Sequence, residues 1–168
     1  MNRLDVNLIN LFSSYHVWED SNRFYFETDY GLKYFVDFTL DDNPQRIAYW
    51  FNLINMSGAA SPKDNKIWQT VFCIIEEFFR NNPDILLYIC STDGEQQAQR
   101  ARLFSYWFTK AGQQERYYFK TAEIKGDDSS RKNNREYVAI IIPRNHPYAK
   151  DILDFFDEEI AMFNTMKP

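Results

Sequence analysis

The chain has 168 residues, of which 45% are hydrophobic and 18% aromatic, and its formal net charge is −5. A chain of this length fits one globular domain that buries enough surface to be stable without disulfides or metals. It has only two cysteines, a number that excludes a disulfide-rich secreted protein, and both lie within apolar runs that favour buried free thiols. The N-terminal residues carry no signal-peptide or transmembrane pattern, so we expect a soluble cytoplasmic protein.

The charge is unevenly distributed along the chain. Between Gln96 and Arg135 there are nine Lys or Arg residues against four acids, so this stretch carries +5 and the rest carries −10. Such an asymmetry favours an anionic partner for residues 96–135, or leaves them as an ordinary solvated surface. Both interpretations stay open at this level.

The first third of the chain reads as a helix followed by three strands. Helical spacing predicts an opening amphipathic helix with an apolar face formed by Leu4, Leu8, Leu11, Phe12 and Tyr15. Alternating apolar residues around Phe24 and over residues 32–40, separated by a turn at Gly31, predict a β-hairpin. A turn at residues 41–44 then leads into a third strand over residues 47–54.

The middle of the chain reads as helix, strand and helix. Ser61 is expected to cap the first of these helices, with Pro62 at its first position. The apolar face of that helix consists of Ile67, Val71, Ile74, Ile75, Phe78 and Phe79, and residues 81–83 end it. Residues 84–90 form a short continuous apolar run, typical of a strand covered on both faces. A helix over residues 95–110, closed by Gly112, is expected next.

The last third reads as two strands and a helix. Strands around residues 117–122 and 137–142 flank a polar connection at residues 125–135. The final helix begins near Pro147, with a predicted apolar stripe of Ile152, Phe156, Ile160 and Phe163. Its opposite face is acidic, formed by Asp151, Asp154, Asp157 and Glu158. The element order predicts a single α+β domain over residues 1–168, with a mixed, mainly antiparallel sheet of about six strands and helices on both faces.

Few catalytic patterns are present in the sequence. It contains two histidines and no spacing typical of zinc ligands, nucleotide-binding loops or a serine nucleophile elbow, so no metal site is predicted. His146, before Pro147, is interpreted as a residue that leads into the last helix rather than as a base. We therefore lean towards a protein that is not an enzyme.

One segment could bind an anion at the start of the predicted helix 95–110. Gly94 follows a buried strand and precedes Arg100 and Arg102, and free N–H groups at a helix N-terminus favour anions. The alternative is that Asp93 and Glu95 satisfy those groups as ordinary caps. Aromatic residues at 106–108 could stack nucleic-acid bases, or simply pack in the core.

The element order resembles that of the GCN5-related N-acetyltransferase (GNAT) family, in which a helix leads into three antiparallel strands, then helix, strand, helix and two final strands. The resemblance implies an acetyl-CoA or other acyl-CoA site in the loop after the third strand, where Gly58 and its small neighbours Ser57, Ala59 and Ser61 stand. It also implies a general-acid Tyr four residues before a Gly. Phe108 occupies that position before Gly112, which leaves Tyr106 as the candidate.

A second resemblance is local. Residues 88–108, which include Asp93, Gly94, Arg100 and Trp107, are similar to a segment of small uncharacterised proteins from Bacteroidetes that are grouped only as a domain of unknown function. The resemblance implies a bacterial cytoplasmic protein and no known activity.

Three functions follow as hypotheses. The first is a non-catalytic bacterial interaction or ligand-binding module with a GNAT-like sheet, whose partner is a protein or a small anionic ligand at residues 96–135. The second is a divergent acyl-CoA-dependent N-acyltransferase that uses the loop around Gly58 and Tyr106. The third is a weak nucleic-acid binder that uses the basic 96–135 region.

Overall fold

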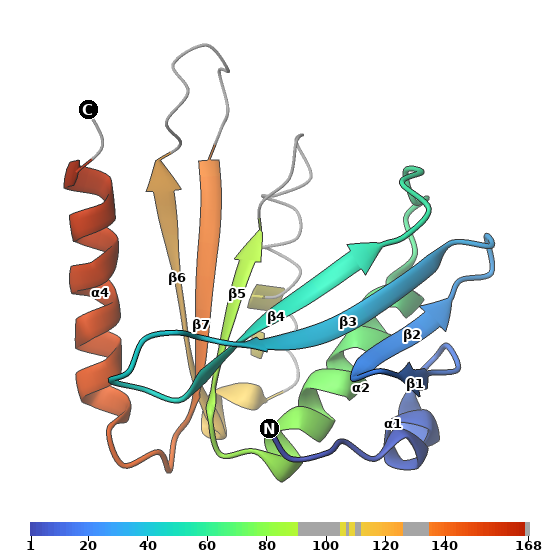
Figure 1. The fold of residues 1–168 in the computed structure, drawn as a ribbon, viewed down its shortest axis with the longest axis horizontal. Coiled ribbons are helices and arrows are strands. Elements are labelled where there is room, and N and C mark those ends of the chain that lie inside the picture. Colours follow the sequence, from blue (N-terminus) through green and yellow to red (C-terminus); the bar gives the residue numbers. More distant parts are fainter. Residues whose placement is uncertain (91–104, 107, 110–111, 126–134, 167–168) are drawn as a thin grey trace. The chain divides into compact units, whose positions relative to one another are not determined.

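The computed structural model describes residues 1–90, 105–106, 108–109, 112–125 and 135–166. The described elements, in chain order, are α1 (Val6–Phe12), β1 (Trp18–Asp20), β2 (Arg23–Glu27), β3 (Lys33–Leu40), β4 (Ala48–Asn55), α2 (Asn65–Asn81), β5 (Ile85–Cys90), the 3₁₀ helix η1 (Gln113–Glu115), β6 (Tyr117–Lys125), β7 (Arg135–Pro143) and α4 (Ala149–Met166) (Figure 1). One mixed, mostly antiparallel sheet of seven strands has the order β1-β2-β3-β4-β5-β7-β6. The predicted α+β class is confirmed. Most of the predicted helix 95–110 and most of the 125–135 connection lie outside the described residues; residues 105–106 and 108–109 of that predicted helix are described and are helical.

The seventh strand is β1, which the sequence analysis missed. It pairs with β2 through a two-residue hairpin in which Asp20 faces Arg23. Ser21 and Asn22 both have positive φ, 53° and 62°, the signature of a type I′ turn whose twist matches that of paired strands. Glycine is the usual residue for this conformation, so a Ser-Asn turn gives a weak sequence signal.

Backbone contacts divide the chain into two compact units. Unit 1 consists of Met1–Thr39 and Phe51–Pro83, and unit 2 consists of Leu40–Trp50 and Asp84–Pro168. Among the described helices, none is long and apolar enough to cross a membrane.

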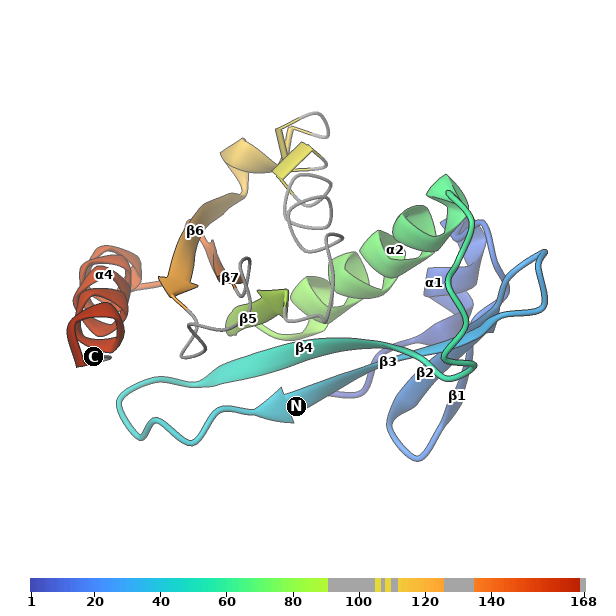
Figure 2. The ribbon, with the colours of Figure 1, turned by 90° about the horizontal axis from the view of Figure 1, so that it is seen from above.

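Unit 1 has an aromatic core between α2 and the strands. Phe24, Phe26, Phe51 and Phe78 are almost fully buried, and the ring of Phe38 stacks on that of Phe78 with 4.8 Å between centroids. Figure 2 shows α1 and α2 on the same side of β1–β3. The predicted apolar face of α2 is confirmed from Ile67 to Phe78, whereas Phe79 is only partly buried.

The predicted start of α2 is wrong. Asp64, not Ser61, caps the helix, because its carboxylate accepts a hydrogen bond from Lys66 N at 3.0 Å. Ser61 Oγ instead donates to the carbonyl of Pro62 at 3.0 Å, three residues before the helix begins. An ionised carboxylate is a stronger acceptor for helix N–H groups than a hydroxyl, and it also suits the positive end of the helix dipole.

The predicted apolar face of the first helix is only partly correct. Leu4 and Tyr15 are buried, but Leu8, Leu11 and Phe12 are exposed, because α1 is only seven residues long and lies between the two anchors. Polar side chains of α2 hold the segment in place instead, since Glu77 accepts from Asp5 N at 3.1 Å and Thr70 accepts from Tyr15 N at 3.1 Å.

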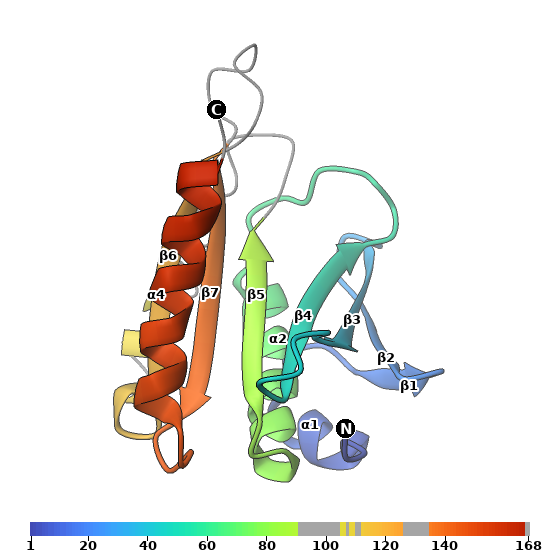
Figure 3. The same ribbon diagram turned by 60° about the vertical axis from the view of Figure 1, so that its left-hand side comes forward.

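Unit 2 has an aliphatic core. β7 pairs antiparallel with both β5 and β6. The buried cluster consists of Ala48, Ile85, Leu87, Val138, Ile140, Ile142, Ala149 and Phe156. α4 lies along β6 and β7 (Figure 3), with Phe156 as its most buried aromatic residue. The prediction that Phe163 belongs to the same stripe is wrong, because its side chain is exposed. Leu153, in an earlier turn of α4 than Phe163, does pack against the cluster.

Candidate functional site

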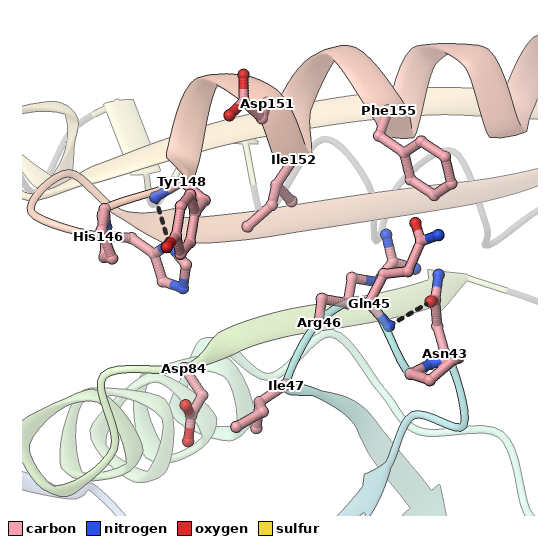
Figure 4. A pocket seen from close by; sticks show the side chains of 12 residues that line it. Asn43, Gln45, Arg46, Ile47, Asp84, His146, Tyr148, Asp151, Ile152 and Phe155 are labelled. Atoms are coloured by element: carbon pink, nitrogen blue, oxygen red, sulfur yellow. Dashed lines mark hydrogen bonds between the residues drawn. The ribbon is translucent and has the colours of Figure 1, made fainter.

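A cavity of about 550 Å³ lies within unit 2, and we call it the α4 pocket (Figure 4). Three segments line it: residues 43–47 before β4, Asp84 before β5, and residues from the turn after β7 into the first turns of α4. Unlike any region singled out from the sequence, it therefore combines residues that lie about 40 and 100 positions apart in the chain.

The pocket wall is largely apolar. Ile152 and Phe155 point from α4 towards residues 43–47, and Ile47 lies opposite them (Figure 4). Ile47 and Tyr148 are 61% and 65% exposed, so the cavity opens to solvent between large apolar side chains. An open, mainly apolar cavity with a few polar groups is the usual form of a ligand site.

A local turn places the residues of the β4 side. Asn43 Oδ1 accepts from Gln45 N at 3.0 Å, and the carbonyl of Asn43 accepts from Arg46 N at 3.4 Å. Asn followed by Pro favours this type of turn, because the amide oxygen imitates a backbone acceptor and proline presets φ. The predicted turn at residues 41–44 thus continues into a hydrogen-bonded turn at residues 43–46, which ends at Arg46.

Arg46 is the most unusual residue of the pocket. Its side chain is only 8% exposed, and its Nε lies 3.2 Å from Asp41 Oδ2 while Nη2 lies 3.4 Å from Glu159 Oε2. Trp50 Nε1 donates to the other oxygen of Asp41 at 3.1 Å, which fixes that carboxylate. Nη1 is buried and has no hydrogen-bond partner in the described part of the chain. The guanidinium is thus neutralised by two carboxylates but keeps one unsatisfied donor group.

His146 organises the start of α4. Its N–H donates to the carbonyl of Pro143 at 2.9 Å, and its Nδ1 accepts from Tyr148 N at 3.2 Å. Because Nδ1 is an acceptor, the proton of the neutral ring lies on Nε2. The expectation that His146 leads into the helix is confirmed by these contacts.

Two described side chains hold their protons more tightly than is usual for their type. Burial, followed by the charge of Asp84, raises the pKa of Tyr49 beside the pocket, so this phenol keeps its proton. Burial also raises the pKa of the Cys73 thiol, to about 11. A thiol reacts as its thiolate, so Cys73 is chemically quiet at neutral pH. The described residues contain no group of His, Cys, Asp and Glu that could hold a metal ion.

The residues implied by the GNAT resemblance fall in both units. Ser57, Gly58, Ala59 and Ser61 lie in unit 1, in an exposed loop that Asn55 organises: its Oδ1 accepts from Ser57 N and Oγ at 3.1 and 2.6 Å, and its Nδ2 donates to the Ala59 carbonyl at 2.8 Å. Gly58 has φ +67°, a conformation that suits glycine. Tyr106 lies in unit 2 and is 57% exposed. The proposed anion-binding residues Gly94, Arg100 and Arg102 lie outside the described residues.

The α4 pocket itself was missed by the sequence analysis. A single basic residue before a strand carries no specific signal, and the partner carboxylate of Glu159 stands 113 positions later in the chain. The acidic residues of the last helix gave the sequence signal for this ion pair, because a Glu beside an acidic helix face can pair with a buried cation.

Comparison with known proteins gives a family and no activity. The model of a family of unknown function, DUF6169, matches residues 63–158. That range contains the segment 88–108 on which the local resemblance was based, together with Asp84 and the α4 side of the pocket. Searches of the curated proteins and of the solved structures found no match to the chain.

Proposed function

Because the chain belongs to DUF6169, a family of unknown function, its role must be inferred from its own residues, and we propose that it is a non-catalytic ligand-binding module whose site is the α4 pocket. The observation that carries this proposal is the buried guanidinium of Arg46 with its unsatisfied Nη1. Leaving a buried donor without a partner costs about 1–3 kcal/mol, more for a charged group. A ligand that supplies the acceptor recovers this free energy.

The size of the cavity supports the same proposal. Sites for small molecules and for single side chains of a partner usually enclose about 300–1,000 Å³, and the α4 pocket has about 550 Å³. Apolar atoms of Ile47, Ile152 and Phe155 provide the contact area, while Arg46 provides orientation. Gln45, an exposed residue, lies next to Arg46 in the pocket lining (Figure 4), and Nη1 is buried in the free protein, so the proposal requires that a ligand displace neighbouring side chains to reach it.

The charges of the pocket restrict the acceptor. Asp41 and Glu159 already balance Arg46, and the further lining carboxylates are Asp84 and Asp151. A full anion would meet net negative charge, so a neutral carbonyl or hydroxyl oxygen suits Nη1 better. The proposed ligand of this pocket therefore has an apolar body and a neutral hydrogen-bond acceptor, in contrast to the anion expected at residues 96–135.

The test uses a neutral probe, N-acetyl-phenylalaninamide, which has one ring and two carbonyl groups. Titration followed by ¹H–¹⁵N correlation spectra should shift resonances of residues 43–47 and 146–155. The shifts should weaken at least fivefold in Phe155→Ser and persist in the matched variant Phe12→Ser, whose ring is exposed in unit 1. Shifts located elsewhere, or equal in both variants, would contradict the proposal.

The rest of the proposal concerns scaffold and location. We retain a GNAT-like sheet as part of it, supported by the order of β4, α2, β5 and the β6–β7 hairpin. A bacterial origin and a cytoplasmic location are also retained, and they rest on the local resemblance of residues 88–108. The acyltransferase alternative gains little support, because Asn55 Oδ1 occupies the Ser57 N–H that would face a pyrophosphate. A thermal melt with excess acetyl-CoA tests it: a rise of several degrees that is lost in Gly58→Trp would favour acyl transfer over the proposed module.

A further inference from the structure

α4 has a second apolar face that continues from the pocket. Its inner face, with Leu153, Phe156 and Ile160, packs on the unit 2 core. A separate stripe of Tyr148, Phe155 and Met162 follows a spacing of seven residues, and these side chains are 65%, 37% and 60% exposed. Because seven residues make about two helical turns, Phe155 and Met162 lie on one side of α4, and Tyr148, which directly precedes the helix, stands at the same spacing.

The length of the stripe indicates the size of the ligand. From Tyr148 to Met162 the rise of about 1.5 Å per residue gives roughly 21 Å. Of the stripe, only Tyr148 and Phe155 line the pocket. One small molecule in the pocket would leave Met162 uncovered, whereas a polypeptide segment of several turns covers the whole line.

The charged residues beside the stripe indicate the sign of the charge that a ligand should carry. Asp151, Asp154 and Glu158 are exposed on α4 and form no ion pair with a described residue. Lys150 is the only basic residue among the described residues of α4. With Asp84 at the pocket wall, the border of the stripe is acidic, and it is complementary to Lys or Arg.

We infer that the α4 pocket and its stripe bind a basic, amphipathic polypeptide segment of a partner protein. One apolar side chain enters the pocket between Ile47 and Phe155, and further apolar side chains cover the stripe as far as Met162. A carbonyl or hydroxyl oxygen of the segment accepts from Arg46 Nη1. Basic side chains of the segment pair with the exposed carboxylates of α4. This inference rests on the proposed function and specifies its ligand.

Charge also separates this occupant from two others. A second copy of the chain would place acidic borders of two α4 helices against each other, which is unfavourable. A nucleic acid would bring its phosphates against the same carboxylates. A basic amphipathic helix laid into an apolar groove is a common mode of recognition, in which residues at i, i+3, i+4 and i+7 act as anchors.

Three labelled 18-residue peptides test the inference by fluorescence anisotropy. The first has Leu at heptad positions a and d and Lys elsewhere, the second has Glu in place of Lys, and the third is a scrambled form of the first. We expect the first to bind at least tenfold more tightly than the other two, with an affinity that falls as salt is added. Equal binding of the scrambled or the acidic peptide, or no binding of the first, would overturn the inference.

Two pairs of protein variants locate the interaction. Phe155→Ser and the double variant Asp151→Lys/Asp154→Lys should each lower the affinity for the first peptide at least tenfold. The matched controls, Phe12→Ser and Asp20→Lys/Glu27→Lys, change exposed residues of unit 1 by the same chemistry and the same charge, and they should bind as the wild type does. Equal weakening by both charge variants would indicate only general attraction to an acidic protein and would contradict the assigned site.

The two proposals can fail separately. If N-acetyl-phenylalaninamide shifts the pocket resonances while no peptide gains affinity from its basic amphipathic face, the pocket binds ligands but the polypeptide inference is wrong. If neither probe perturbs residues 43–47 and 146–155, both proposals are wrong.

Discussion

Glu77 in unit 1 and Arg46 in unit 2 are both charged side chains that are largely buried, and they are satisfied to different degrees. Glu77 in unit 1 is 1% exposed and is fully engaged: it accepts from Asp5 N at 3.1 Å and from Asn81 Nδ2 at 2.5 Å, and it pairs with Arg80. Arg46 in unit 2 is 8% exposed, has two carboxylate partners, and leaves Nη1 without a hydrogen bond among the described residues.

The difference agrees with the separate roles proposed for the two residues, a structural one for Glu77 and a ligand-binding one for Arg46. Glu77 joins α2 to the N-terminal segment, so all its bonds serve the fold. Arg46 pairs through Nε with Asp41 and through Nη2 with Glu159 of α4, while its side chain also lines the α4 pocket. Since buried polar groups are almost always satisfied, this exception among the described residues is the observation from which the proposed ligand site was inferred.

The largest effect is expected from Arg46→Ala. Its removal leaves Asp41, whose side chain is 7% exposed, without a cation, and losing one partner of a buried ion pair costs about 3 kcal/mol. Urea unfolding measures the change. Arg46→Lys keeps the charge and should lose less stability. A wild-type midpoint in Arg46→Ala would mean that Asp41 and Glu159 do not depend on the guanidinium.

Glu77→Ala should cost about 2 kcal/mol, because Asp5 N and Asn81 Nδ2 lose a charged acceptor while Arg80, which is half exposed, returns to water. The matched control is Glu27→Ala, an exposed acid at the end of β2, which should change stability by less than about 0.5 kcal/mol. Equal losses in the two variants would remove the distinction between a buried anchor and a surface acid.

The reaction rate of Cys73 tests whether this thiol of unit 1 is protected from reagents in the folded protein. Because burial raises its pKa to about 11, we expect it to react with a disulfide reagent at pH 8 at least tenfold more slowly than a free thiol. The Cys90→Ser variant makes Cys73 the reporting thiol. Since the folded state holds this proton more tightly than the unfolded state does, the contribution of Cys73 to stability falls as the pH rises from about 9 to 11. Rapid labelling at pH 8 would show that the thiol is accessible and its pKa ordinary.

The smallest effect is expected from Met162→Gln. Its side chain is 60% exposed, and Gln keeps a similar helix propensity, so the free energy of unfolding should change by less than about 0.5 kcal/mol. The same variant should lower the affinity of the protein for the basic amphipathic peptide. A loss above about 1 kcal/mol in thermal or urea unfolding would mean that the stripe already packs within the molecule.

The spacing of apolar residues within single segments predicted most of the fold, because helices and strands are determined by periodicity over short stretches of the chain. The alternation in β2 and β3 and the stripe from Ile67 to Phe78 each reflect one element packed on one face. The wrong predictions occur where the length of an element or the conformation of a turn determines the local structure. α1 ends after seven residues, which leaves Phe12 exposed, and the β1–β2 turn adopts positive φ without glycine.

The site depended on contacts that no local pattern contains. Arg46 meets Glu159 across the fold, and Phe155 looks in the sequence like one more residue of an amphipathic helix. That α4 has two apolar faces is visible only once Phe156 is placed in the core and Met162 is placed outside it. The GNAT-derived loop residues and Tyr106 remain predictions.

The path of β4 limits how this protein can be divided in the laboratory. Its first residues, Ala48–Trp50, belong to unit 2 and the rest to unit 1, so the chain crosses between the units at residues 39–40, 50–51 and 83–84. A fragment that begins at Asp84 retains α4 but loses Asp41, Arg46 and Ile47, and with them one wall of the pocket. Screens for partners should therefore use full-length protein as bait, since a truncated library clone covering only the C-terminal half would miss the site.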